Sequence, residues 1–243
     1  MKSPITFDNI RSYAYCNSAL LTGKPKALAL GFIGLGNQTM YEEYSEGTCL
    51  AEDQILYLIP YNDPWMWMND DAVALADELV DVIFDHYGLS DGFPIVSTGG
   101  SMGGLAALTY MAYAKRTPVA AVANCPVCDL VSHFSERPDL PRTIYAAYRR
   151  SPGTLEEALA AGSPLHLAKA GRLPRASYAV FHCGGDQAVS KALHSDRFIP
   201  ALRKALPDCT VIYHEIPGRS HGDLGEEMGA VYLDTIRRFA LGL

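Results

Sequence analysis

The sequence Gly-Gly-Ser-Met-Gly-Gly, residues 99–104, joins an apolar stretch at residues 93–97 (FPIVS) to a helical pattern that begins at Met102. It contains Gly-x-Ser-x-Gly, a spacing that lets a strand turn sharply into a helix while exposing a hydroxyl. Glycines two positions on either side of the serine allow neighbouring backbone to pass close to the turn. This context predicts a nucleophilic Ser101 at the end of a buried strand. The alternative is a glycine-rich turn that binds an anion or only packs.

Short apolar stretches recur on both sides of this turn and alternate with amphipathic stretches. We expect strands at residues 27–31, 55–60, 93–97, 119–124, 178–183 and 210–216, and helices at residues 70–87, 102–114, 191–206 and 225–241. Strands that are apolar almost throughout are typical of a parallel sheet covered on both faces. The alternation therefore predicts an α/β fold with a doubly wound, mostly parallel sheet. Residues 5–7 and 12–16 are expected to form an antiparallel pair at its edge.

A proline-rich interval of about fifty residues separates the fourth of these strands from the fifth. It is too long for an ordinary connection and too interrupted for one helix. Short helices are expected at residues 140–149, 154–161 and 163–170. The sequence thus predicts a single domain, residues 1–243, with a small cap-like helical insertion at about residues 128–175. Whether the insertion contributes to a site or is only structural stays open.

Composition excludes several classes of function. The net charge of −7 argues against a nucleic-acid partner, which would require a basic surface. The first ten residues do not resemble a secretory signal, and no apolar run is long enough for a membrane span. Six cysteines are too few for a disulfide scaffold of this length. A reduced cytoplasmic enzyme, without membrane association, is the simplest interpretation.

Seven histidines are candidates for the base that would take the proton of Ser101. His221 lies in Gly-Arg-Ser-His-Gly, residues 218–222, between the last expected strand and the last helix. A loop at this place can carry an imidazole to the edge where the serine lies, so His221 is the predicted base. The others are interpreted as packing or surface residues, or, for the two in the insertion, as possible substrate contacts: His86, His133, His166, His182, His194 and His214.

The predicted acid that orients this imidazole is Asp186, which follows the strand expected at residues 178–183. An aspartate at that place could instead only cap a helix. Asp129, near the end of the preceding strand, is the rival acid, and Asp223 is a further alternative.

Three segments together resemble the α/β-hydrolase superfamily. They are the turn around Ser101, the Asp-x-x-Val of residues 186–189 and the Gly-x-x-His of residues 218–221. The resemblance implies the chain order Ser101, Asp186, His221 and a reaction without metal or organic cofactor. Ser-Met-Gly-Gly at residues 101–104 and Ser-Pro-Leu-His at residues 163–166 are similar to dienelactone-hydrolase-like esterases. They also resemble the catalytic domain, without propeller, of the prolyl-oligopeptidase group.

The resemblance also implies an oxyanion hole built from two backbone N–H groups. One would come from Met102, at the start of the helix after the serine. The second would come from the glycine-rich stretch at residues 31–36, where Phe32 is the matching position. Ile33 and Gly34 remain alternative donors, because leucine occupies the place of the family's histidine at position 30. A glycine-rich turn without a catalytic role is the other interpretation.

Three further motifs give weaker indications of function. The glycines of residues 31–36 lack the G-x-G-x-x-G spacing of a dinucleotide site. Cys125 and Cys128 have C-x-x-C spacing, but without a second pair they are interpreted as buried thiols rather than zinc ligands. Trp65 and Trp67 either line a substrate pocket or pack beneath the insertion.

The expected activity is therefore that of a serine esterase acting on a small-molecule ester, with a carboxylesterase or a carbohydrate acyl esterase as subtypes. Trp65 and Trp67 would offer stacking surfaces in the carbohydrate case. A peptidase of the prolyl-oligopeptidase type is the alternative activity. A non-catalytic binding protein on a hydrolase scaffold is the alternative of another class.

Overall fold

The computed structural model describes residues 4–36 and 42–243. Its centre is a seven-stranded sheet of order β1-β3-β2-β4-β5-β6-β7, in which only β1 is antiparallel to its neighbour. The strands are β1 (Ala14–Cys16), β2 (Ala27–Phe32), β3 (Ile55–Pro60), β4 (Ile95–Gly100), β5 (Ala120–Asn124), β6 (Ser177–Cys183) and β7 (Val211–Ile216). The six expected parallel strands are all present, and the expected doubly wound α/β fold is confirmed.

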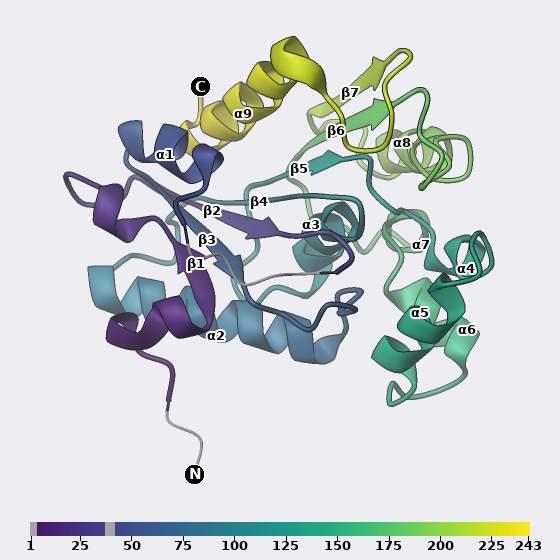
Figure 1. Ribbon diagram of the computed structural model, residues 1–243, viewed down its shortest axis with the longest axis horizontal. Helices are drawn as coiled ribbons and strands as arrows, with labels where there is room; N and C mark the ends of the chain where they lie inside the picture. The colour runs from purple at the N-terminus through teal and green to yellow at the C-terminus, as the bar shows by residue number, and fades with distance from the viewer. Residues whose placement is uncertain (1–3, 37–41) are drawn as a thin grey trace.

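Helices cover both faces of the sheet (Figure 1). α1 (Ser45–Glu52) and α9 (Gly225–Leu241) lie over one face, and α2 (Asp70–Tyr87), α3 (Met102–Tyr113) and α8 (Ser195–Ala205) lie over the other. The helices between β5 and β6 are α4 (Leu130–His133), α5 (Leu140–Tyr148), α6 (Leu155–Ala161) and α7 (Pro164–Lys169). They occupy the interval for which the sequence predicts a cap-like insertion, and that assignment remains a prediction.

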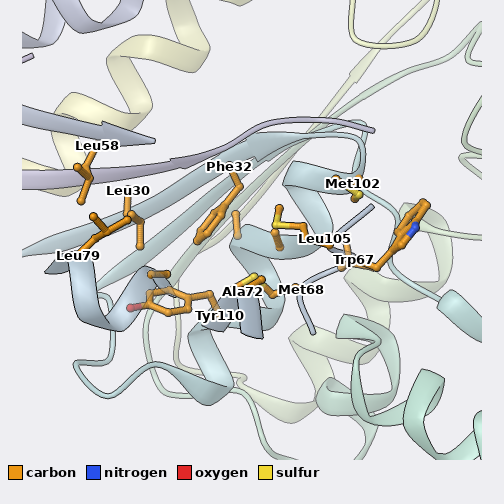
Figure 2. Packing of buried hydrophobic residues seen from close by; sticks show 14 of the residues in the cluster. Leu30, Phe32, Leu58, Trp67, Met68, Ala72, Leu79, Met102, Leu105 and Tyr110 are labelled. Carbon is orange, nitrogen blue, oxygen red and sulfur yellow. The ribbon is translucent and has the colours of Figure 1, made fainter. Parts of the chain in front are cut away.

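Side chains of alternate strand residues enter two different cores, because successive residues of a strand point to opposite faces. Leu28 and Leu30 of β2 pack with α2 and α3, whereas Ala27 and Ala29 pack with α1 and α9. Figure 2 shows the first of these cores, to which Phe32 at the end of β2 and Met102 at the start of α3 both contribute. Two covered faces explain why these strands read as almost continuous apolar runs.

The N-terminal prediction is correct only in part. Ala14–Cys16 forms an edge strand, but its antiparallel partner is β3, and Phe7–Ser12 is a 3₁₀ helix, η1. A second short 3₁₀ helix, η2, spans Ser18–Leu20. Helix α1 was not expected, because its sequence SEGTCLAE has little apolar periodicity. At Gly47 a Cβ atom would lie 2.1 Å from the Tyr15 hydroxyl oxygen, so tight packing rather than helix propensity selects that residue.

In the part of the chain that the structure describes, no helix has the length and apolar character that crossing a bilayer requires.

The buried side chain of Asn17 connects the edge of the sheet to α1. Its amide donates to the Gly47 and Ile55 carbonyl oxygens, and its Oδ1 accepts from the Tyr57 N–H at 2.7 Å. Because Asn17→Ala leaves these groups buried without partners, we expect unfolding free energy to fall by about 2–4 kcal/mol. Chemical denaturation measures this loss. Asn9→Ala removes a half-exposed side chain whose hydrogen bonds water can replace, so the unfolding free energy should fall by less than about 1 kcal/mol. Equal losses of unfolding free energy in the two variants would contradict the prediction.

Candidate active site

Ser101 occupies the sharp turn between β4 and α3. Its backbone has φ 59° and ψ −122°, a conformation rarely adopted by a residue with a side chain. The turn is held by the Ser101 N–H, which donates to the Asn124 carbonyl oxygen at 2.9 Å. A Cβ atom on Gly103 would lie 2.1 Å from the Phe32 carbonyl oxygen, and one on Gly99 would lie 2.5 Å from it. The two glycines of Gly-x-Ser-x-Gly are therefore required by the close approach of β2.

Backbone donors lie on two sides of this serine. Met102 is the first residue of α3, where the N–H groups have no partner within the helix. On the other side, a Cβ atom built on Gly34 would lie 3.7 Å from the Ser101 Cβ atom. Phe32 itself is still a strand residue, paired with Gly99, so Ile33 and Gly34 are the first residues beyond β2. Gly34, one of the alternatives for the second oxyanion donor, therefore lies near the serine side chain.

His221 and Asp186 are brought together as the sequence predicts. The His221 Nδ1 atom lies 2.6 Å from the Asp186 Oδ2 atom. Asp186 has no exposed side-chain surface, whereas 28% of the His221 side chain is exposed. An imidazole fixed from behind by a buried carboxylate and open in front is suited to exchange protons with a bound substrate.

Asp186 is ionised because its hydrogen bonds outweigh its burial. Burial opposes the charge, but the His182 and His221 rings and the N–H groups of Ala188 and Val189 hold the pKa of this carboxyl well below its usual range. The two N–H groups donate to Oδ1 at 2.8 and 2.9 Å, and the His182 Nε2 atom lies 3.4 Å from Oδ2. In return, the hydrogen bond with Asp186 and a contact with the Cys125 thiol raise the pKa of His221 from 6.5 to about 9.

The serine and the histidine are linked through the end of β5. Asn124 accepts the Ser101 N–H through its carbonyl oxygen, and its side-chain amide donates to the Gly222 carbonyl oxygen at 3.0 Å. Among the described residues, no hydrogen bond joins the Ser101 hydroxyl directly to the His221 ring. The two residues are therefore held at one edge of the sheet by a shared neighbour, and direct proton transfer between them is part of the proposal below.

The two alternative acids form hydrogen bonds and ion pairs with residues other than His221. Asp129 caps α4, hydrogen-bonds to the Ser132 hydroxyl and pairs with His166 and Arg197. Asp223 pairs with Arg219 at 3.1 Å. Of the three candidate acids, Asp186 is the one that contacts the imidazole of His221.

The two tryptophans differ in their exposure. Trp67 is buried, its indole N–H donates to the Thr143 hydroxyl, and its carbonyl oxygen accepts from the Tyr148 hydroxyl. It therefore packs beneath the insertion, which corrects its assignment as a substrate-binding residue. Trp65 is 37% exposed, with the Arg142 guanidinium 5.0 Å from its ring centroid. It remains a candidate contact.

A cluster between the insertion and the start of α8 has the composition of a metal site. Ligand atoms of His133, Glu136 and His194 lie within 4.8 Å of one another. The His194 Nδ1 atom accepts the N–H groups of Cys128 and Asp129, so its Nε2 atom must carry the hydrogen that it shares with Glu136. A metal at Nε2 would require an imidazolate, which is unfavourable at neutral pH. The arrangement fits a structural network that fixes α4 against α8.

Sequence reasoning missed three residues that support this site: Asn124, Cys125 and His182. His182 was interpreted as a packing or surface residue, although it stands four positions before Asp186 at the end of the same strand and loop. Its Nδ1 atom lies 2.6 Å from the Ser195 hydroxyl oxygen, which fixes the ring behind Asp186. Histidine in an otherwise apolar strand was the signal available in the sequence, because a buried imidazole requires hydrogen-bond partners.

No protein-family model matches this chain, and no curated protein matches its sequence. Solved structures do match. Puromycin hydrolase has a TM-score of 0.71 at 13% identity over 91% of this chain, which spans 35% of that chain. S-formylglutathione hydrolase from Agrobacterium tumefaciens has a TM-score of 0.69 at 14% identity, with 89% and 84% of the two chains covered. Esterase 2 of Thermogutta terrifontis has a TM-score of 0.63 at 17% identity, with 94% and 88% covered. The chain has the α/β-hydrolase fold.

Asp186→Asn tests the acid assignment through the pH profile. His221 must be neutral to accept a proton, so kcat/KM should rise with pH through the His221 pKa of about 9. The amide cannot stabilise an imidazolium, so kcat should fall by about 10³–10⁴-fold and the rising limb should move to lower pH. Stopped or continuous ester assays from pH 6 to 10 measure both effects. Asp129→Asn should leave the limb in place; an unchanged limb in Asp186→Asn would overturn the assignment.

Proposed function

We propose that this protein is a serine hydrolase that cleaves a small-molecule ester by two-step acyl transfer. The observation that carries the proposal is the 2.6 Å hydrogen bond between His221 and a fully buried Asp186, at the sheet edge where Ser101 occupies a strained turn. A hydroxyl becomes nucleophilic when a neighbouring base removes its proton. The residue types needed for such activation are all present at this edge.

In the first step, the Ser101 Oγ atom attacks the ester carbonyl carbon while the His221 Nε2 atom takes the hydroxyl proton. Asp186 stabilises the imidazolium that forms, and the proton is then passed to the departing alcohol. The N–H of Met102, with Phe32 or the adjoining Ile33–Gly34 backbone, binds the oxyanion. In the second step, water attacks the acyl-enzyme with His221 again as base. The mechanism requires no metal or organic cofactor.

An ester is favoured over an amide for two reasons. The solved structures that this chain covers over most of their length are named an S-formylglutathione hydrolase and an esterase. Among the proposed site residues, no pair of carboxylates marks recognition of a free peptide N-terminus. The similarity to puromycin hydrolase keeps a peptidase as the second candidate. The carbohydrate subtype depends on Trp65 alone, since Trp67 is buried.

A fluorophosphonate probe tests whether Ser101 is an activated nucleophile. The folded wild type should be labelled. Ser101→Ala should not be labelled, although it should unfold at the same temperature as the wild type. Ser101→Ala and His221→Ala should each lower kcat for p-nitrophenyl acetate by about 10⁴–10⁶-fold, and the double variant little further, because the residues act as a unit. Labelling absent from the wild type would favour a binding protein on this scaffold.

Paired substrates separate the two activities. An amide leaves only when its nitrogen is protonated by the imidazolium, so an open site hydrolyses esters far faster. We expect kcat/KM for p-nitrophenyl esters to exceed that for aminoacyl-p-nitroanilides by at least about 10³-fold. Comparable values for the two series would identify a peptidase. A set of acetylated sugars beside simple esters then tests the carbohydrate subtype.

A further inference from the structure

Cys125 has a backbone conformation that is unusual for its residue type. It follows β5 directly and has φ 44°, in the left-handed region that favours glycine. The Cys125 N–H donates to the Phe181 carbonyl oxygen at 2.7 Å, and the side chain is fully buried. A cysteine in this region costs free energy unless its surroundings compensate. The conformation therefore indicates that the direction of the thiol matters.

The thiol points at the loop that carries the proposed base, residues 217–224, here called the histidine loop. The Cys125 Sγ atom accepts the Gly222 N–H at 3.5 Å and the Cys183 N–H at 3.3 Å. The Asn124 side chain holds the other side of Gly222 by donating to its carbonyl oxygen at 3.0 Å. The backbone N–H and carbonyl groups of Gly222 are thus bound by two consecutive residues, Cys125 and Asn124.

The same thiol also reaches the imidazole. The Cys125 Sγ atom, a ring nitrogen of His221 and a carboxylate oxygen of Asp186 lie within 4.8 Å of one another. Because Asn124 also binds the Ser101 N–H, one dipeptide connects the nucleophile, the histidine loop and the ring of the base.

We propose that Cys125 is a positioning residue for catalysis, which with Asn124 fixes the His221 ring between Ser101 and Asp186. Its sulfur holds the loop through Gly222 and lies beside the ring when the ring becomes an imidazolium. This inference rests on the proposed hydrolase function and adds a residue to the machinery that the superfamily resemblance identified.

In the described part of the chain, few groups surround His221, so a change in its pKa reports specifically on the contact with Cys125. The groups that face His221 are Asp186 from the loop after β6 and Cys125 from the end of β5. The Cys183 thiol, at the end of β6, donates instead to the Asp223 carbonyl oxygen. Within the histidine loop itself, Arg219 and Asp223 form an ion pair. The Cys125 contact is among the interactions that raise the pKa of His221, after that of Asp186. Removing the thiol should therefore lower this pKa, whereas a purely structural change should not move it.

Three variants test the proposal. Cys125→Ala should lower kcat for p-nitrophenyl acetate by about tenfold to a hundredfold, the range expected for a hydrogen bond to a charged group, and move the rising limb of kcat/KM to lower pH. Asn124→Ala should lower kcat without moving the limb, because its amide does not touch the ring. Cys128→Ala is the matched control, a buried thiol three residues away without contact to His221. It should stay within about twofold of wild-type kcat.

Two further measurements make the result independent of hydrolysis. NMR titration of the His221 ring should give a lower pKa in Cys125→Ala than in wild type and Cys128→Ala. Hydrogen exchange at the Gly222 amide should be faster in Cys125→Ala, because its acceptor is removed. If wild type hydrolyses no ester, the proposed function fails, and these measurements still decide the role of Cys125. Equal behaviour of Cys125→Ala and Cys128→Ala in activity, ring titration and exchange would overturn the proposal.

Discussion

The close contact between the first turn of α3 and the end of β2 is the constraint on which the site depends. At Gly103 a side chain would collide with the Phe32 carbonyl oxygen, so the helix can approach the strand only because that position is glycine. This approach forces β4 to turn at Ser101 through a strained conformation. Gly34, two residues beyond β2, lies near the serine side chain. One steric requirement thus positions Ser101 and the nearby backbone N–H groups together, before any polar interaction is considered.

The polar part of the site depends on a buried charge that its hydrogen-bond partners stabilise. Burial of Asp186 would favour a neutral carboxyl, yet two backbone N–H groups and two imidazoles keep it ionised. Because Oδ1 is occupied by backbone donors, Oδ2 is left to face the rings of His182 and His221. The fold therefore fixes both the charge and the direction of the carboxylate, and the orientation of His221 follows from it.

The sequence predicted the parallel strands and the pairing of His221 with Asp186 because both leave strong local patterns. Apolar runs of strand length identify a doubly covered sheet, and the spacings around Ser101, Asp186 and His221 are short motifs. It did not predict α1 or the contacts of Cys125, and it could not decide between the two alternatives for Trp67, because these depend on contacts between distant segments. Trp67 is paired with Thr143, 76 positions further along the chain, and no local pattern marks such a partner. Cys125 looked like an ordinary buried thiol because its left-handed backbone cannot be inferred from its residue type.

Two residues with strained backbones lie at neighbouring strand ends, and the residue between them binds both sides of the site. Ser101 and Cys125 are both non-glycine residues with positive φ, and they follow the adjacent strands β4 and β5. Between them, Asn124 binds the N–H of the serine and the carbonyl group after the histidine. A relaxed backbone at either position would redirect the hydroxyl or the thiol, so neither strained residue could change alone without altering how Asn124 connects Ser101 to the residue after His221. Strain at both strand ends is then the consequence of directing a hydroxyl and a thiol from two adjacent strands to one edge of the sheet.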